Sequence, residues 1–311
     1  MYRFALLAIA AIGVVPARSL DAQSLPAMSR IAQLPTYESF EGFTTPPPLE
    51  AWPQEPRPSN QWCHQLLPDG LVFDSYLAGT KESRFSLHLV KSRGDSTFLD
   101  ATLGTRIGIW RYGTTDAFRP EGWQLDVEGS GQIRLDLPSD RDVRSVDFRA
   151  GIPVSYGVGR HRMKFAFYHL SSHVGDEFLI KNPGFNRLNY SRDVLVLGYS
   201  YYMNQKLRIY AEAGWAAYSD VGLPWEFQFG LDYAPCGPTG LRGEPFWAMN
   251  AHLREEVNFG GAFTFEAGWA WRGQDANMLR TGLFYYNGES NQFSFFDEHE
   301  AQIGYGLWYD F

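Results

Sequence analysis

From about residue 84 to the C-terminus, hydrophobic and polar residues alternate along short segments that are separated by Gly, Pro, Asp and Asn. The last segment shows the pattern most clearly, because Ile303, Tyr305, Leu307, Tyr309 and Phe311 all fall on one face. Successive side chains of a strand point to opposite faces of its sheet. An apolar face that suits lipid, opposite a small or polar face that suits a lumen, is typical of a transmembrane β-barrel strand.

The alternation therefore predicts an all-β fold, a transmembrane antiparallel β-barrel of about 12 strands. The predicted strands are 84–91, 98–110, 122–135, 143–155, 162–171, 191–203, 206–218, 224–234, 246–256, 260–272, 277–287 and 301–311. With an even number of strands, the chain enters and leaves the barrel on the same side, which is expected to be the periplasmic one. The connections 156–161 and 203–206 are then periplasmic, and the longer connections 172–190 and 288–300 are extracellular.

The N-terminal part of the chain lacks this alternation and predicts two export-related segments. Arg3 precedes an uncharged apolar run from Phe4 to Val15, which is typical of a secretory signal peptide and too short to span a bilayer. Cleavage is expected near Ala22, with Ala17 or Ser19 as alternatives. Residues 44–60 are rich in proline and predict an extended linker. We expect a signal peptide at 1–22, a periplasmic Pro-rich leader at 23–83 and an outer-membrane barrel at 84–311.

Composition agrees with this organisation. The chain has 311 residues, 16% of them aromatic, and a formal charge of -8. After the first 20 residues it has no apolar run of the roughly 18 residues that a membrane helix needs. The acidic balance and the scattered basic residues argue against nucleic-acid binding, which needs a clustered basic face.

The C-terminal phenylalanine suggests how the barrel reaches its membrane. Phe311 follows alternating aromatic residues and resembles the C-terminal signal by which outer-membrane barrels are recognised for insertion. The predicted location is the bacterial outer membrane, with the leader in the periplasm. The predicted partners are outer-membrane lipids and the barrel-assembly machinery.

Two cysteines, Cys63 and Cys236, are the only thiols of the chain. Export permits a disulfide, but two cysteines do not establish one. A disulfide between the leader and the 235–245 connection is therefore one of two alternatives, the other being two free thiols.

A histidine and a serine share a face of the strand predicted at 162–171. His169 and Ser171 are two residues apart and align with Met163, Phe165 and Phe167, so they are expected on the lipid-facing wall near its extracellular end. An imidazole beside a hydroxyl is the minimum for activating a serine nucleophile. A third group must orient the imidazole, and the downstream candidates are Asp176, Glu177, Asn186 and Asn189.

The His-x-Ser pattern on an outward barrel face resembles outer-membrane phospholipase A and lipid A deacylase. The segment Asn186-Arg187-Leu188 is similar to the one that carries the third catalytic residue of the phospholipase, and the likeness covers about residues 165–190. The resemblance implies a lipid acyl hydrolase with His169 and Ser171 as catalytic residues, and Asn186 or Glu177 as their partner. This chain has Ser172 and His173 where those enzymes have Asn-Gly.

Over most of its length, from about residue 62, the chain more closely resembles an uncharacterised bacterial family of unknown function. The resemblance rests on blocks such as YHLSSHVGDEF, YAEAGWA, PWEFQFG, HLREEV and FFDEHE. It implies an outer-membrane barrel and supplies no activity.

Two functions therefore remain open. The first is a structural or transport-type barrel in which His169 and Ser171 only anchor the strand and loop. The second is a lipid acyl hydrolase that uses them. No nucleotide motif or zinc-type spacing occurs, and no cofactor is expected apart from Ca²⁺, which Asp176 and Glu177 could bind with loop carbonyls.

Overall fold

The computed structural model describes residues 61–93 and 96–311. The predicted signal peptide and the Pro-rich segment 44–60 lie outside these residues. Within the described residues, no helix is long and apolar enough to cross a membrane.

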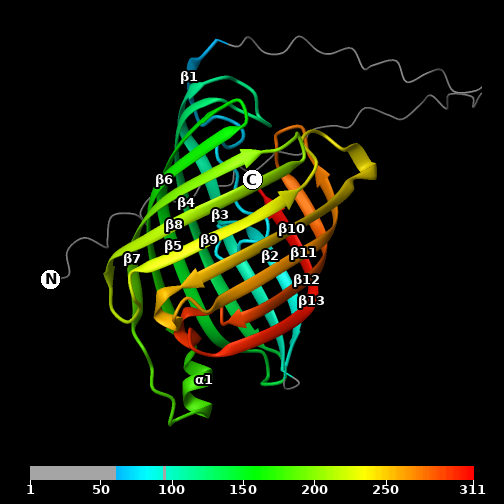
Figure 1. Cartoon of the computed structure of the whole chain (residues 1–311). Helices are drawn as coiled ribbons and strands as arrows, with labels where there is room; N and C mark the ends of the chain where they lie inside the picture. Colours follow the sequence, from blue (N-terminus) through cyan, green and yellow to red (C-terminus); the bar gives the residue numbers. More distant parts are fainter. Residues whose placement is uncertain (1–60, 94–95) are drawn as a thin grey trace, which may run out of the picture. The chain divides into compact units, whose positions relative to one another are not determined.

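Twelve antiparallel strands, β2 to β13, form a closed barrel, because β2 pairs with both β3 and β13 (Figure 1). The strands are β2 (Phe85–Ser92), β3 (Thr97–Gly113), β4 (Gly122–Asp136), β5 (Asp142–Val158), β6 (His161–Val174), β7 (Tyr190–Tyr202), β8 (Leu207–Ser219), β9 (Trp225–Tyr233), β10 (Glu244–Arg254), β11 (Gly261–Arg272), β12 (Met278–Glu289) and β13 (His299–Asp310). The short strand β1 (Cys63–Leu66) pairs with the end of β3. Short helices are α1 (Asp176–Lys181), η1 (Gly240–Arg242), η2 (Glu255–Val257) and η3 (Phe293–Phe295).

Each of the twelve predicted segments corresponds to one strand of the barrel wall, so the predicted fold is confirmed. The alternation that predicted the strands also fixes which side chains face outward. Along β6, outward residues are exposed and inward residues are buried in strict alternation as far as Leu170. We call the end of the barrel where β2 begins and β13 ends the entry end, and the opposite end, which carries α1 and η3, the far end.

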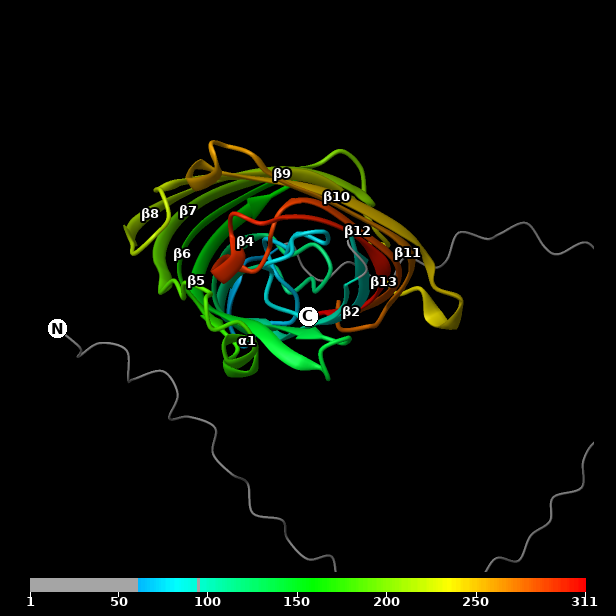
Figure 2. The same ribbon diagram turned by 90° about the horizontal axis from the view of Figure 1, so that it is seen from below.

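The barrel interior contains a chain segment that the sequence pattern does not predict there. Residues 68–84, which we call the inner segment, follow β1 and lie within the ring of strands (Figure 2). Val72, Phe73 and Tyr76 are almost completely buried. The Tyr76 ring stacks on Tyr210 of β8, with ring centroids 3.9 Å apart. The wall begins at Phe85, close to the expected boundary, but the structure differs from the expected leader, because its last residues pack inside the barrel.

The far end of the lumen is closed by the connection between β12 and β13. Phe293, Ser294 and Phe295 of η3 are all buried. The backbone N–H of Ser294 donates to the Ser172 Oγ at 2.8 Å, and the N–H of Phe293 donates to Asp147 at 3.1 Å. Lys81 of the inner segment pairs with the same Asp147, so the inner segment and η3 meet inside the barrel.

Between these two segments, the lumen is filled with paired charges. Arg134 is fully buried and donates to Asp100 at 2.6 and 2.8 Å and to Glu300 at 2.6 Å. Other buried pairs with the same chemistry join Arg106 to Asp126, Lys164 to Glu212, Arg208 to Asp232, and Arg280 to Glu266 and Asp310. Interior side chains usually fill small barrels. Buried charges remain ionised at low cost only when each one is paired and hydrogen-bonded.

The filled lumen leads to a first prediction. Purified protein in a planar lipid bilayer should give no steady single-channel conductance, because the inner segment, η3 and the ion pairs occupy the cross-section. A water-filled porin of at least 16 strands inserted under the same conditions is the positive control. Reproducible conductance steps like those of the porin would contradict this description of the interior.

The two cysteines are both free in the structure. Cys63 begins β1, and the Cys236 Sγ lies 3.8 Å from the Gln205 Oε1. Of the two alternatives that the sequence left open, the structure therefore contains the pair of free thiols.

Candidate functional site

The predicted His169 and Ser171 lie on the outer wall of β6, toward the far end. Below them on the same face, Met163, Phe165 and Phe167 are exposed. On β7 the outward side changes from the exposed Leu195 to Asp193 and Ser191 at this level, whereas on β5 it stays apolar, with Ala150 and the exposed Phe148 beside His169 and Ser171. His169 and Ser171 therefore lie at the border between the exposed apolar wall and a polar stretch of β7.

The third member of this group is Asp193, on the adjacent strand β7. His169 and Asp193 are direct register partners. The His169 Nδ1 lies 2.7 Å from the Asp193 Oδ1. Because a carboxylate can only accept, Nδ1 carries the hydrogen, and Nε2 of the neutral ring keeps a free lone pair. The side chains are partly exposed, at 48% for His169 and 34% for Asp193, so lipid or water can approach the imidazole.

Ser171 is the next outward residue along β6. Its register partners are Phe148 on β5 and Ser191 on β7. Within the described part of the chain, the Ser171 hydroxyl forms no hydrogen bond, either with His169 or with any other group. A hydroxyl that no other group holds is free to rotate toward the imidazole, and catalytic hydrogen bonds are often long before substrate binds.

In the structure the partner of His169 is Asp193 and not one of the residues that the sequence predicted. Glu177 is exposed on α1, and Asn186 is exposed in the connection that follows it. Asn189 donates to Asp220 instead, at 2.9 Å. The structure brings none of the expected candidates into hydrogen-bond contact with His169, since Asp193 occupies that position. Its signal was present in the sequence, as an acidic residue within the strand predicted at 191–203, but only the strand register shows that it faces His169.

The acidic residues of α1 do not form a metal centre in the structure. Asp176 and Glu177 are both exposed in the first turn of the helix. Among residues 61–93 and 96–311, no group of three or more His, Cys, Asp or Glu side chains is arranged to hold a metal ion. Ca²⁺ binding at Asp176 and Glu177 therefore stays a prediction from the sequence.

Outside the barrel wall, α1 is held by ion pairs of Lys181 and by Phe178, whose ring centroid lies 5.3 Å from that of the buried Phe295 in η3. Lys181 lies 2.5 Å from Asp142 at the start of β5, and this hydrogen bond raises the pKa of the lysine. None of the helix residues is buried. The helix lies beyond the far end of the barrel, in the connection that joins the strands of His169 and Asp193 (Figure 1).

Comparison with known proteins gives a family and a set of similar folds. The model of a family described as "Protein of unknown function (DUF1207)" matches residues 59–311. The comparison with curated proteins gave no match.

Several solved outer-membrane barrels resemble the structure. They include the outer-membrane phospholipase of Salmonella typhi, crystallised as a dimer with bound calcium, which is 11% identical and covers 73% of this chain and 90% of its own, with a TM-score of 0.48. The phospholipase A of Escherichia coli is 10% identical, covers 75% of this chain and 93% of its own, and has a TM-score of 0.46. The KdgM porin in complex with disordered oligogalacturonate is 10% identical, covers 73% of this chain and 99% of its own, and has a TM-score of 0.41. At these values the matches carry no inference about activity.

Proposed function

Since the chain belongs to the DUF1207 family, whose description names no activity, we propose a function from the chain's own geometry: it is an outer-membrane lipid acyl hydrolase. The observation that carries the proposal is the 2.7 Å contact between His169 and Asp193, with Ser171 next on the same outward face. Serine, histidine and an acid form the machinery of serine hydrolases, which occurs on unrelated folds. Here the acid contacts the histidine, and the serine is the next outward residue of the same strand.

Each residue has a defined part in the reaction. Asp193 accepts the Nδ1 hydrogen, holds the imidazole in one tautomer and stabilises the imidazolium that forms. The Nε2 of His169 takes the proton of Ser171 as its Oγ attacks the acyl carbonyl carbon. The same proton then passes to the leaving alcohol oxygen as the ester bond breaks. Water, deprotonated in turn by His169, hydrolyses the acyl-serine and releases the fatty acid.

The position of the site on the outer wall indicates the class of its substrate. Acyl chains in the bilayer would lie against the apolar wall formed by Phe165, Phe167 and Leu195, which places their ester carbonyls near Ser171. We therefore infer a lipid ester as the substrate, from a phospholipid or from lipid A.

The proposal includes a location and an orientation. The barrel lies in the bacterial outer membrane, with the entry end and the leader on the periplasmic side. His169 and Ser171 then face the outer leaflet. The aromatic strand β13 and Phe311 are the features by which the assembly machinery would recognise the chain.

A covalent probe tests the nucleophile. Folded protein in neutral detergent should react with a fluorophosphonate, which modifies activated serines, and peptide mapping should place the label on Ser171. His169→Ala should abolish labelling, because the serine then has no base. Ser191→Ala, which removes the hydroxyl opposite Ser171, should label normally. Absence of label on the wild-type protein, or label that survives His169→Ala, would refute the proposal.

A further inference from the structure

One stretch of the barrel wall lacks a neighbouring strand. β2 pairs with β3 only between Thr97 and Thr102, and β1 pairs with β3 from Trp110 onward. Between them, residues 103–108 of β3 have a strand partner on the β4 side only, as far as the described residues go. An unpaired strand edge in a membrane is costly, because backbone groups cannot hydrogen-bond to lipid. The opening is therefore a feature that calls for an explanation.

A cavity of about 280 Å³ lies at this opening. It lies between β3, the start of the inner segment, the connection after β11 and the C-terminal Phe311. Its outer rim is apolar, since Leu67 and Ile107 are exposed there. On the flanking strands, Leu103 of β3 and Leu307 of β13 continue the exposed apolar wall. The volume lies just below the range of about 300–1,000 Å³ for ligand pockets, which suits one acyl chain rather than two.

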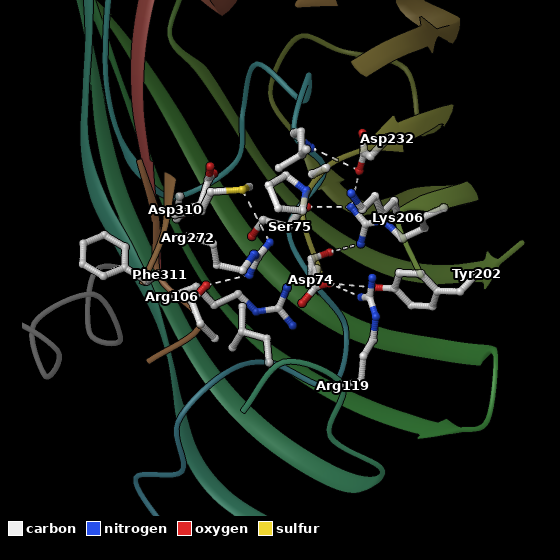
Figure 3. A pocket seen from close by; sticks show the side chains of 18 residues that line it. Asp74, Ser75, Arg106, Arg119, Tyr202, Lys206, Asp232, Arg272, Asp310 and Phe311 are labelled. Carbon is white, nitrogen blue, oxygen red and sulfur yellow. Dashed lines mark hydrogen bonds and ion pairs between the residues drawn. The ribbon is translucent and has the colours of Figure 1, made fainter. Parts of the chain in front are cut away.

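The opening leads to a second, basic cavity within the entry end. The two cavities share Leu71, Arg106 and Phe311. The inner cavity has five basic residues in its lining, Arg106, Arg119, Lys206, Arg208 and Arg272, and three acidic ones, Asp74, Asp232 and Asp310. Figure 3 shows the guanidinium groups of Arg106, Arg119 and Arg272 turned toward a common space beside Asp74.

Arg272 differs from the other four in its partners. Arg119 pairs with Asp74 at 3.1 Å, Arg208 with Asp232, Lys206 with Glu244 at 2.5 Å, and Arg106 with Asp126 at 2.6 Å. Arg272 donates only to the Ala276 carbonyl at 2.7 Å and to the Met278 sulfur at 3.5 Å, and no carboxylate of the described residues pairs with it. Its Nε is buried without a hydrogen-bond partner. Asp74 and Asp310 are electrostatic neighbours of Arg272, but Asp74 pairs with Arg119 and Asp310 with Arg280. A bound anion would therefore give Arg272 an ion pair of its own.

We propose that this lateral opening binds a single-chain anionic lipid from the bilayer, with its acyl chain along residues 103–108 of β3 and its acidic head on Arg272. The order of the two cavities supports this occupant, because the apolar rim at the wall leads inward, past Asp69 and Asp275, to Arg272, the basic lining residue that has no ion pair among the described residues. A neutral lipid would leave Arg272 unpaired, and a free anion would leave the apolar slot empty. The site is separate from Ser171, so it does not depend on the proposed hydrolase activity.

Photocrosslinking with a palmitic acid analogue that carries a terminal diazirine tests this site. The full chain is reconstituted into phosphatidylcholine vesicles containing the probe, irradiated and mapped by peptide mass spectrometry. We expect label on peptides that contain residues 103–108, Leu67 or Phe311. The corresponding diazirine hexadecanol, which lacks the charge, should label these peptides at least tenfold less. Equal labelling by the alcohol, or label only on other parts of the wall, would overturn the proposal.

Substitutions test whether labelling by the acid depends on the positive charge of Arg272 as well as on the apolar slot. Arg272→Gln should lower labelling by the acid at least tenfold. Asn277→Asp, an isosteric change in the cavity lining, should lower it in the same direction by adding a negative charge. Arg242→Gln, at an exposed arginine of η1 at the same end, is the control and should label as wild type. If Arg272→Gln does not fold, Asn277→Asp decides alone, and wild-type labelling of that variant would refute the site. Excess inorganic phosphate should not displace the acid, and displacement would instead assign the site to free anions.

Discussion

Ser171→Ala is expected to lower the rate of acyl release from phospholipid by at least about 10³-fold. Removal of the nucleophile from a serine hydrolase leaves only the catalysis due to binding and oxyanion stabilisation, and losses of this order or larger follow. The substitution removes one oxygen at a partly exposed position, so the fold should not change. The measurement is release of labelled fatty acid from phospholipid in mixed micelles with purified protein.

A matched control distinguishes loss of the nucleophile from any effect on the wall. Ser191→Ala makes the same chemical change on β7, directly across from Ser171, and should keep wild-type acyl release. Equal rates for the wild-type protein and Ser171→Ala would remove Ser171 from the reaction. A loss in Ser191→Ala equal to that in Ser171→Ala would indicate a structural effect of either hydroxyl.

Arg134→Met should be among the most destabilising single substitutions in the barrel, at about 3–5 kcal/mol in the free energy of unfolding. Arg134 is fully buried and is held by Asp100 and Glu300. Without the guanidinium, two carboxylates remain in the filled lumen without their shared partner. Removal of one member of a buried pair costs more than the pair itself contributes, because the remaining charge is left unpaired.

Denaturant titration of the protein folded into lipid vesicles measures this effect. The midpoint should fall markedly for Arg134→Met, while the slope stays constant. Arg187→Met, at an exposed residue in the connection after α1, should change the free energy of unfolding by less than about 0.5 kcal/mol. A small effect at Arg134 would mean that water reaches this network in the folded protein.

The barrel wall could be predicted from the sequence because its signal is local. Each strand carries its own alternation, and the face of Ile303, Tyr305 and Leu307 is exposed as that alternation requires. The outward direction of His169 and Ser171 followed from the same rule. Strand parity also indicated which connections are long, since the connection 175–189 holds α1 and the turns near 159 and 204 are short.

The interior and the third site residue could not be predicted, because both depend on contacts between distant parts of the chain. Nothing in the pattern of residues 68–84 indicates a closed surface into which Phe73 and Tyr76 could pack. Asp193 faces His169 only through the register of β6 with β7, across a long connection. The sequence pattern therefore favours the loop residues Glu177 and Asn186, which lie nearer to His169 in sequence.

The most direct test of the account compares acyl release by four proteins: wild type, Ser171→Ala, Asp193→Asn and the double variant. If Ser171, His169 and Asp193 act as one unit, Asp193→Asn alone should lower the rate by about 10²-fold, within the range of general-base catalysis. In the Ser171→Ala background the same change should have no further effect, because residues of one catalytic unit are strongly non-additive. Full additivity of the two losses, or no acyl release by the wild-type protein, would contradict the account.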